Sequence, residues 1–569
     1  MKKYSILILL FGVMLSFSAC DDFLDKPPFD TISDQDYWKT ENHARTYSYG
    51  FYTRYFGGFG SAYSYVQFFL GQTFNDDIAF NVQSEFSPIR IPETDSGWNF
   101  ETIRKSNYML ESIEGMTGIG DEAKNHWLGI ARFFRGMEYA NLSFIYGDVP
   151  WYDRVPATDE KDYLYKDRDP RSEVVKNILA DFRFAAEHVR PDDGELNINR
   201  YVVAAMASRV MLREGTFLKY HNIDQALAKE CLTFVRDVCL VVMDSKKYTI
   251  ADNYNALFSS DDLVGNKEVI FYRKYLEGIL MHSILTYNNK EPQTGASRDL
   301  LESYLTKDGL PIHTKPNWKA VTAAEFFKDR DPRLTATFRS QYYIRGEDCS
   351  PFAYSTSGYS MRKFMDDAMA TSSDLKYLQS NNVTDAPCIR YAEVLLNYAE
   401  AMYELDLLTQ TELDKSLNLI RARKGVEMPA LQIIGGNPGV NGAVFDDPER
   451  DPDVPSLLWE IRRERRIELT QEGFRFNDLK RWHKLDYMYN GKNPKIRYGA
   501  YIRYSDYPKA NKTEVYIENG ANEGFILYNR GQERKAPQAK HYVYPVASNT
   551  IQLYKDNGYT LSQTKEWIE

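Results

Sequence analysis

The stretch Leu457–Trp482, LLWEIRRERRIELTQEGFRFNDLKRW, decides the fold of this chain. Seven of the nine residues in Glu460–Glu468 are charged, yet apolar residues recur through the stretch at helical spacing. Pro455 and Ser456 just before it favour the start of a helix, and Gly473 favours its end. The sequence therefore predicts a helix that ends near the glycine and accommodates many charges.

Two of these charges lie on the face of the helix that is expected to be buried. Arg465 and Glu468 fall on the same face as the apolar residues Leu458, Ile461 and Leu469. An unpaired buried charge costs several kcal/mol or more, so each of these side chains needs a partner of opposite charge. We interpret them as parts of a structural network of ion pairs and hydrogen bonds. An active site that uses the same charges is the alternative.

Two further segments predict long helices with buried polar residues. Asp121–Tyr146 and Pro387–Leu405 combine small and aromatic residues at spacings of three and four, which lets helices approach closely. The polar side chains of these helices are expected to join the same structural network. Its predicted members are Arg132, Arg135, Glu138, Arg390, Glu393, Arg465 and Glu468.

The remaining chain alternates between helical and loop-rich parts. The helices arrive in two groups, mainly at 98–246 and 386–482, and no clean period near 34 residues relates them. Loop-rich sequence fills 57–97, 247–385 and 483–569. We expect a strand within Asn266–Tyr275 and further helices at Glu41–Phe56, Gly97–Gly115, Ser172–Val189, Asn199–Gly215, Asp224–Asp244 and Leu413–Lys424.

The composition is that of a globular protein with many aromatic residues. Of 569 residues, 43% are hydrophobic and 26% are charged, and the net charge is −10. An acidic chain without a long basic run is not expected to bind nucleic acid. Aromatic residues make up 14%, and 42 of them are tyrosines. A tyrosine ring can cover the C–H face of a sugar while its hydroxyl stays hydrated, although most of these rings are expected to pack between helices.

The usual sequence patterns of enzymes are absent from the chain. There is no G-x-S-x-G, H-E-x-x-H, Walker or G-x-G-x-x-G motif, so we predict no catalytic residue and no cofactor. A pair of carboxylates for glycoside hydrolysis could still come from any of the many acidic residues. No metal site is predicted, because the five cysteines lack metal-ligand spacing and the four internal ones are interpreted as mostly buried thiols. The carboxylates of the acidic loop Asp446–Pro455 are expected to be solvated, with calcium binding as the alternative.

Aromatic residues in loops are the candidates for a binding site. Sugar sites need flat aromatic platforms on loops that a rigid scaffold holds in place. Trp318 and Tyr65 are the first candidates, and Tyr287, beside Asn288 and Asn289, is the third. For each of them, ordinary packing is the alternative.

The N-terminus predicts export and lipid attachment. Met1–Ala19 begins with lysines, continues with an apolar run shorter than the about 20 residues that span a membrane, and ends in small residues, so we interpret it as a signal peptide. The sequence FSAC that ends at Cys20 resembles a bacterial lipobox, in which this cysteine carries the lipid. A plain signal peptide with an incidental cysteine is the alternative. Residues 20–40 would then form a lipidated tether, and 41–569 a single domain.

Several blocks of this chain together resemble the SusD/RagB family, the surface glycan-binding lipoproteins of Bacteroidota. The longest block is RRERRIELTQEGFRFNDLKRW, and CDDFLDKPP resembles the usual start of the mature family members. Further similar blocks are FFRGMEYANLSFIYGDVP, NKEVIFYRKY, IRYAEVLLNYAEA and NLIRARKGV. The resemblance implies a mainly α fold, in which both helical groups form one tetratricopeptide-like helical-hairpin core beside an irregular subdomain of loops and short strands.

The resemblance also implies a function. The protein would be a surface-exposed lipoprotein of the outer membrane that lies as a lid over a SusC-like TonB-dependent transporter. It would capture a glycan, deliver it to the transporter and catalyse nothing. A family member that binds peptides or another nutrient, and a surface-anchored hydrolase, are the alternatives. Because family members differ most in their loops, the resemblance implies no specific ligand contact.

Overall fold

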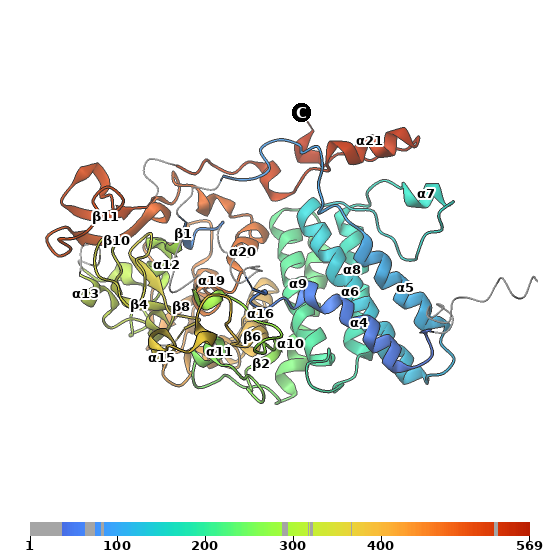
Figure 1. The fold of residues 1–569 in the computed structure, drawn as a ribbon, viewed down its shortest axis with the longest axis horizontal. Coiled ribbons are helices and arrows are strands. Elements are labelled where there is room, and N and C mark those ends of the chain that lie inside the picture. The colour runs from blue at the N-terminus through green and yellow to red at the C-terminus, as the bar shows by residue number, and fades with distance from the viewer. Residues whose placement is uncertain are drawn as a thin grey trace, which may run out of the picture.

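The computed structural model describes residues 37–62, 74–80, 85–286, 294–316, 318, 322–365, 367–528 and 533–568. Figure 1 shows two parts: long helices stack side by side in one, and short strands, short helices and loops form the other. Helices from the C-terminal third, among them α16 and α19, lie between the two parts. Signal peptide and lipidation at Cys20 are predictions that lie outside the described residues.

Successive long helices pack against one another as hairpins. They are α4 (Glu41–Tyr55), α5 (Glu101–Gly115), α6 (Asp121–Tyr146), α8 (Arg171–His188), α9 (Arg200–Tyr220) and α10 (Gln225–Asp244). Helix α5 packs on α6, α6 on α8, α8 on α9 and α9 on α10. From the second group, α16 (Tyr391–Glu404) packs on α9 and α10, α19 (Ser456–Glu468) on α16, and α20 (Arg475–Arg481) on α9. The predicted mainly α fold with a helical-hairpin core is confirmed.

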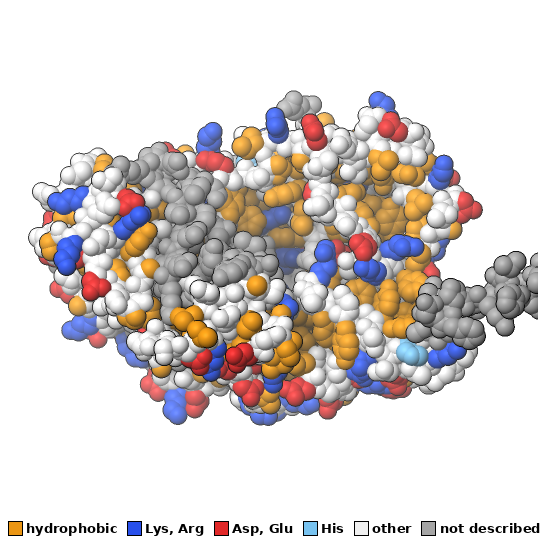
Figure 2. Space-filling model, viewed as in Figure 1, with side chains coloured by type: hydrophobic (Ala, Val, Ile, Leu, Met, Phe, Trp, Pro, Cys, Tyr) orange, Lys and Arg blue, Asp and Glu red, His pale blue; other side chains and the backbone are white. Residues whose placement is uncertain are grey.

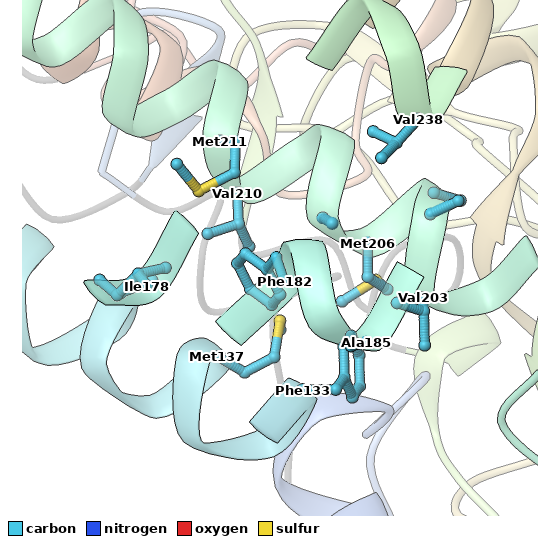
Figure 3. Close-up of a cluster of buried hydrophobic side chains, with 14 of the residues drawn as sticks. Phe133, Met137, Ile178, Phe182, Ala185, Val203, Met206, Val210, Met211 and Val238 are labelled. Carbon is cyan, nitrogen blue, oxygen red and sulfur yellow. The ribbon is translucent and has the colours of Figure 1, made fainter. Parts of the chain in front are cut away.

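Small residues let these helices approach closely. Figure 3 shows apolar side chains of α6, α8, α9 and α10 meeting in one cluster, among them Phe133, Phe182 and Met206. A Cβ added to Gly136 of α6 would lie 3.1 Å from the ring of Phe182 on α8. Any larger residue at this position would therefore push the two helices apart.

Helix α19 lies where three apolar clusters meet. Ile467 belongs to the cluster of the strand-rich part, and Leu469 just after the helix belongs to the cluster of the long helices. Leu457 and Ile461 belong to a third cluster. Ten of the thirteen residues of α19 are buried, so its charged side chains cannot turn to solvent and must find partners inside the protein.

The second part contains small antiparallel sheets. Strand β1 (Ile78–Phe80) pairs with β3 (Thr294–Ala296), β2 (Val269–Arg273) with β6 (Ala386–Arg390), β4 (Phe338–Tyr342) with β5 (Tyr359–Met361) and β10 (Tyr498–Arg503) with β11 (Glu523–Leu527). Strands β7 (Gln432–Ile434), β8 (Asn437–Val440) and β9 (Ala443–Val444) form a three-stranded sheet. Short helices lie between these strands in the chain: α11 (Ala256–Ser259) just before β2, then α12 (Arg298–Ser303), α13 (Ala323–Phe327), α14 (Pro332–Thr337), α15 (Asp367–Thr371), α17 (Gln410–Asp414) and α18 (Leu417–Arg421). Two other short helices lie elsewhere: α7 (Lys161–Leu164) between α6 and α8, and α21 (Ser548–Asp556) after β11.

Several predicted boundaries differ from the structure. The segment before Tyr391 is the strand β6 rather than the start of a helix, because it pairs with β2 and contains Pro387, which cannot donate a helical hydrogen bond. Helix α19 ends at Glu468, and Gly473, with φ +83°, lies in the turn that leads to α20. The helix expected at Leu413–Lys424 is split into α17 and α18, because Ser416 has a non-helical backbone.

The internal cysteines are less uniformly buried than predicted. Cys231 and Cys239 are buried in α10, and burial raises the pKa of both thiols. Cys349 and Cys388 are half-buried. All four are free thiols.

Candidate functional site

A cavity of about 480 Å³ lies where α12, α19 and the acidic loop meet. Residues of the loop from Asp447 to Pro452 form one part of its lining, and Arg298, Glu302 and Ser303 of α12 form another. Figure 2 shows the face of the molecule on which a hollow separates the helical part from the strand-rich part. The volume of the cavity is within the range of small-molecule sites, about 300–1,000 Å³.

Five half-buried aromatic side chains line this cavity. Tyr498 and Phe525 stack with their ring centroids 5.2 Å apart, and the guanidinium of Arg298 lies 5.2 Å from the Phe525 ring. Trp459 and Tyr487 meet edge to face at 6.4 Å. The fifth aromatic residue is Trp318. Such rings can bind the C–H face of a sugar while the polar groups between them take its hydroxyls.

His313 is held between two carboxylates at the wall of the cavity. Its Nε2 lies 3.2 Å from Glu302, and its Nδ1 lies 3.1 Å from Asp447. Burial by itself would lower the pKa of His313, but the two hydrogen bonds outweigh burial and raise it. When the ring is protonated, both nitrogens donate to these carboxylates, which holds the ring in one orientation. Its edge packs against the ring of Trp318 at 4.7 Å, which fixes the position of this tryptophan.

The buried carboxyl groups of the cavity are held in the charged form. Burial alone would raise the pKa of Glu302, but Arg298 and His313 outweigh it and lower this pKa to about 2. A general acid of a glycosidase requires the opposite shift, because it must carry a proton near neutral pH. Neighbouring cations depress three further carboxyl pKa values in the same way, those of Asp299, Asp447 and Asp451.

Of the three predicted binding residues, the structure describes Trp318. It lies on the wall of the cavity, half-buried, and its backbone carbonyl accepts a hydrogen bond from Arg298 at 3.3 Å. Tyr65 and Tyr287 lie outside the described residues. Two other aromatic residues, Phe59 and Tyr359 of strand β5, are buried in apolar clusters.

Glu468 lies at the centre of a buried ion-pair network. Its carboxylate accepts hydrogen bonds from Arg390 and Arg423 at 2.7 Å each and from Arg333 at 3.0 Å. Arg390 also binds Glu472 and Glu268. Since Glu268 immediately precedes strand β2, the network extends to this strand. The network thus connects α19, the loop after α18, β6 and α14.

The other predicted polar residues pair in separate places. Arg465 binds Asp478 of α20 at 2.9 Å, so it does not share a partner with Glu468. Arg132 and Arg135 share the partner Asp181, at 3.6 Å and 2.7 Å. Glu138 accepts from Arg54, and Glu393 accepts from Arg209, each at 2.6 Å.

Sequence reasoning missed much of the cavity wall. The acidic loop was expected to be solvated, but Asp447 and Asp451 are buried. Asp447 pairs with Arg463 and His313, and Asp451 with Lys484, because cations from distant segments surround the loop. The aromatic residues missed are Trp459, Tyr487, Tyr498 and Phe525. One signal was available for Trp459: at 100° per residue it lies off the apolar face formed by Leu458, Ile461 and Leu469.

The part of the chain that the structure describes lacks two features. No helix there is long and apolar enough to span a membrane. Nor do three or more His, Cys, Asp or Glu side chains of these residues converge as a metal site would require.

Comparison with known proteins gives consistent matches. The model of the SusD family matches residues 285–567. The SusD-like protein P38 of Formosa agariphila is 22% identical over 511 residues, which cover 85% of this chain and 93% of that protein. A second relative in the same organism, the SusD-like protein P25, is 20% identical over 304 residues, which cover 49% of this chain and 53% of that protein.

Solved structures share the fold. A SusD-like carbohydrate binding protein from Bacteroides fragilis superposes with a TM-score of 0.67 at 22% identity, covering 91% of this chain and 98% of that one. The surface glycan-binding protein A from Bacteroides fluxus superposes with a TM-score of 0.55 at 16% identity, covering 93% of this chain and 99% of that one. At these identities the likeness shows that the arrangement of helices and strands is shared.

Proposed function

Because this chain belongs to the SusD family, we propose that it binds a glycan in the cavity around Trp318 and delivers it to a SusC-like TonB-dependent transporter. The lipid on Cys20 anchors the protein to the outer membrane, facing outward. Residues 41–569 act as a single domain, and Tyr65 and Tyr287 contribute further contacts with the glycan.

The observation that carries this proposal is the aromatic cavity. Five half-buried rings surround a space of about 480 Å³, the size of a small-molecule site. His313 keeps the ring of Trp318 in place through its two carboxylate partners. Charged side chains between the rings can exchange hydrogen bonds with sugar hydroxyls.

Binding proceeds without catalysis. A retaining or inverting glycosidase needs one carboxyl group whose pKa is raised, so that it can protonate the leaving oxygen. In this cavity the pKa of Glu302 is lowered to about 2, and those of Asp299, Asp447 and Asp451 are also depressed. These groups serve as hydrogen-bond acceptors and as counter-charges for the arginines.

Affinity electrophoresis in gels that contain soluble polysaccharides tests the proposal. The purified protein should be retarded by at least one polysaccharide, and Trp318→Ala should weaken this binding by about fivefold or more, since an aromatic platform contributes about 1–3 kcal/mol. The matched control is Tyr49→Ala, which removes a ring that is 45% exposed on α4, away from the cavity.

Two outcomes would contradict the proposal. Unchanged binding by Trp318→Ala would remove this residue from the site. Release of reducing ends from a polysaccharide by the purified protein would show that it is an enzyme.

A further inference from the structure

A smaller cavity of about 40 Å³ adjoins the aromatic one. Six of its eight lining residues also line the aromatic cavity, and Arg462 and Trp482 complete it. A cavity needs about 10–15 Å³ to hold one water molecule, so this space has room for the oxygens of a small polar group. We call it the side cavity.

The lining of the side cavity carries positive charge. Four of its eight residues are arginines, and none is Asp or Glu. Three of the guanidinium groups have carboxylate partners that lie outside the lining of the side cavity. Arg463 pairs with Asp447 and Glu460, Arg466 with Asp77 and Asp299, and Arg475 with Asp76.

The fourth arginine, Arg462, is buried and has only a distant ion-pair partner. It is 6% exposed, and among the described residues its Nε and Nη2 atoms have no hydrogen-bond partner. The carboxylate of Glu404 lies 3.7 Å away and already accepts hydrogen bonds from Lys219 and Tyr220. The guanidinium is held between the rings of Tyr220 and Trp482, at 4.9 Å and 4.3 Å.

We propose that the side cavity is an anion subsite of the glycan site, and that the protein therefore prefers glycans that carry a carboxylate or a sulfate ester. Buried donors without acceptors are unfavourable, and the one carboxylate that pairs with Arg462 among the described residues lies 3.7 Å away and is shared with Lys219 and Tyr220. A ligand anion supplies the missing acceptors and a further negative charge. An uncharged analogue can still accept hydrogen bonds from the guanidinium, but it lacks the ion-pair part of this gain. This inference rests on the proposed glycan binding and names the class of glycan.

Matched pairs of oligosaccharides test the preference by calorimetry on the intact protein. One pair is an oligogalacturonate and its methyl ester, and the other is a carrageenan oligosaccharide and its desulfated form. In at least one pair the charged member should bind at least tenfold more tightly, and added salt should reduce the difference. The pair that responds distinguishes a carboxylate from a sulfate. Equal affinities within a pair that binds would overturn the preference for that anion, and equal affinities in both pairs would overturn the inference.

Variants of Arg462 test whether the side cavity is responsible. Arg462→Met keeps an unbranched side chain beside the two rings and removes the charge, so it should weaken binding of the charged member and abolish the preference. Arg154→Met makes the same substitution at a guanidinium that is 45% exposed and lines neither cavity, and it should keep the preference. A preference that survives in Arg462→Met would overturn the inference.

Thermal unfolding in sodium sulfate provides a test that does not depend on sugar binding. Compared with sodium chloride at equal ionic strength, sulfate should raise the Tm of the wild type more than that of Arg462→Met. An equal rise in both proteins would show that no anion subsite exists. A rise specific to the wild type, together with no binding to any polysaccharide, would support the subsite and reject glycan binding.

Discussion

At the scale of single residues, Glu468 shows how this protein buries charge. Burial alone would raise the pKa of its carboxyl group, but Arg423, Arg390 and Arg333 outweigh burial and hold this pKa well below its ordinary value. All four side chains are at most 2% exposed. A carboxylate in this position is required by three cations at once, so its role is structural.

Replacing Glu468 by Ala should therefore destabilise the protein. Three buried guanidinium groups would lose an acceptor, and breaking a buried ion pair costs about 3–5 kcal/mol. Urea unfolding measures the loss. Glycan affinity of the folded variant should stay the same, since Glu468 does not line the cavity.

Glu114→Ala is the matched control for this experiment. Glu114 lies on the exposed side of α5, and its removal should change the free energy of unfolding by about 0.5 kcal/mol or less. A large loss of glycan affinity in Glu468→Ala, at unchanged stability, would place Glu468 in the binding site instead of the scaffold.

At the scale of elements, single buried groups connect helices that are distant in the chain. Glu400 of α16 accepts two hydrogen bonds of 2.6 Å from Arg481 and one of 2.7 Å from Trp482, at the end of α20. Although burial alone would raise the pKa of Glu400, Arg481 and the neighbouring arginines lower it to about 2.

The lowered pKa of Glu400 predicts a pH dependence. Because the folded-state pKa lies below the unfolded value of about 4.3, the stability from this group is present above that value and is lost as the pH falls towards 2. Glu400→Gln should thus lower the free energy of unfolding by a few kcal/mol at neutral pH. Urea titrations should show this difference from the wild type shrinking between about pH 4.5 and pH 2. A difference that does not depend on pH would contradict the assignment.

Two glycine substitutions should have opposite effects on stability: one in the contact of α9 with α10, and one on the exposed side of α4. A Cβ at Gly215 would lie 3.0 Å from the Cβ of Cys231 and 3.3 Å from the carbonyl oxygen of Ala228. Gly215→Ala should therefore destabilise the protein by about 1–3 kcal/mol through overpacking.

Gly50 of α4 provides the matched control for this contact. No atom lies within 4 Å of a Cβ added there, so Gly50→Ala should stabilise the protein by up to about 1 kcal/mol through helix propensity. Chemical unfolding of both variants measures the two effects. Equal effects at both positions would show that the approach of α9 and α10 does not depend on the glycine.

At the scale of the whole molecule, the fold brings the two parts of the chain together at one cavity. Trp459 and Arg463 of α19 line it, together with Trp318 and Phe525 from the strand-rich part. The charged stretch from residue 457 to 482 was expected to stand apart from the binding site. Under the proposed function it supports the core and the site together, since one side of α19 faces the cavity.

Association with the transporter should strengthen glycan binding. Under the proposed function this protein closes as a lid over the transporter and so shields the bound glycan from water, and polar contacts are stronger in a site from which water is excluded. The complex of both proteins, purified in detergent, should bind a retained polysaccharide fragment more tightly than the isolated protein does. Calorimetry on the two samples measures the difference, and equal affinities would argue against a closed cavity.

The sequence alone determined the features that depend on near neighbours. The bounds of α6 match the predicted Asp121–Tyr146, since helical periodicity and the glycine that follows it are local signals. The need for buried partners at Arg465 and Glu468 was also visible, because both fall on the helix face that Leu458, Ile461 and Leu469 define.

The tertiary structure alone decided which distant residues meet. Arg423 and Glu268 are 155 positions apart, and no local pattern indicates that they pair. The same holds for the burial of Asp447 and for the meeting of Trp318 with Trp459 around one cavity, since both depend on how α19 packs against α12 and the loops. Secondary structure follows from short-range hydrogen bonding and periodicity, whereas a site is made by contacts between segments that only folding brings together.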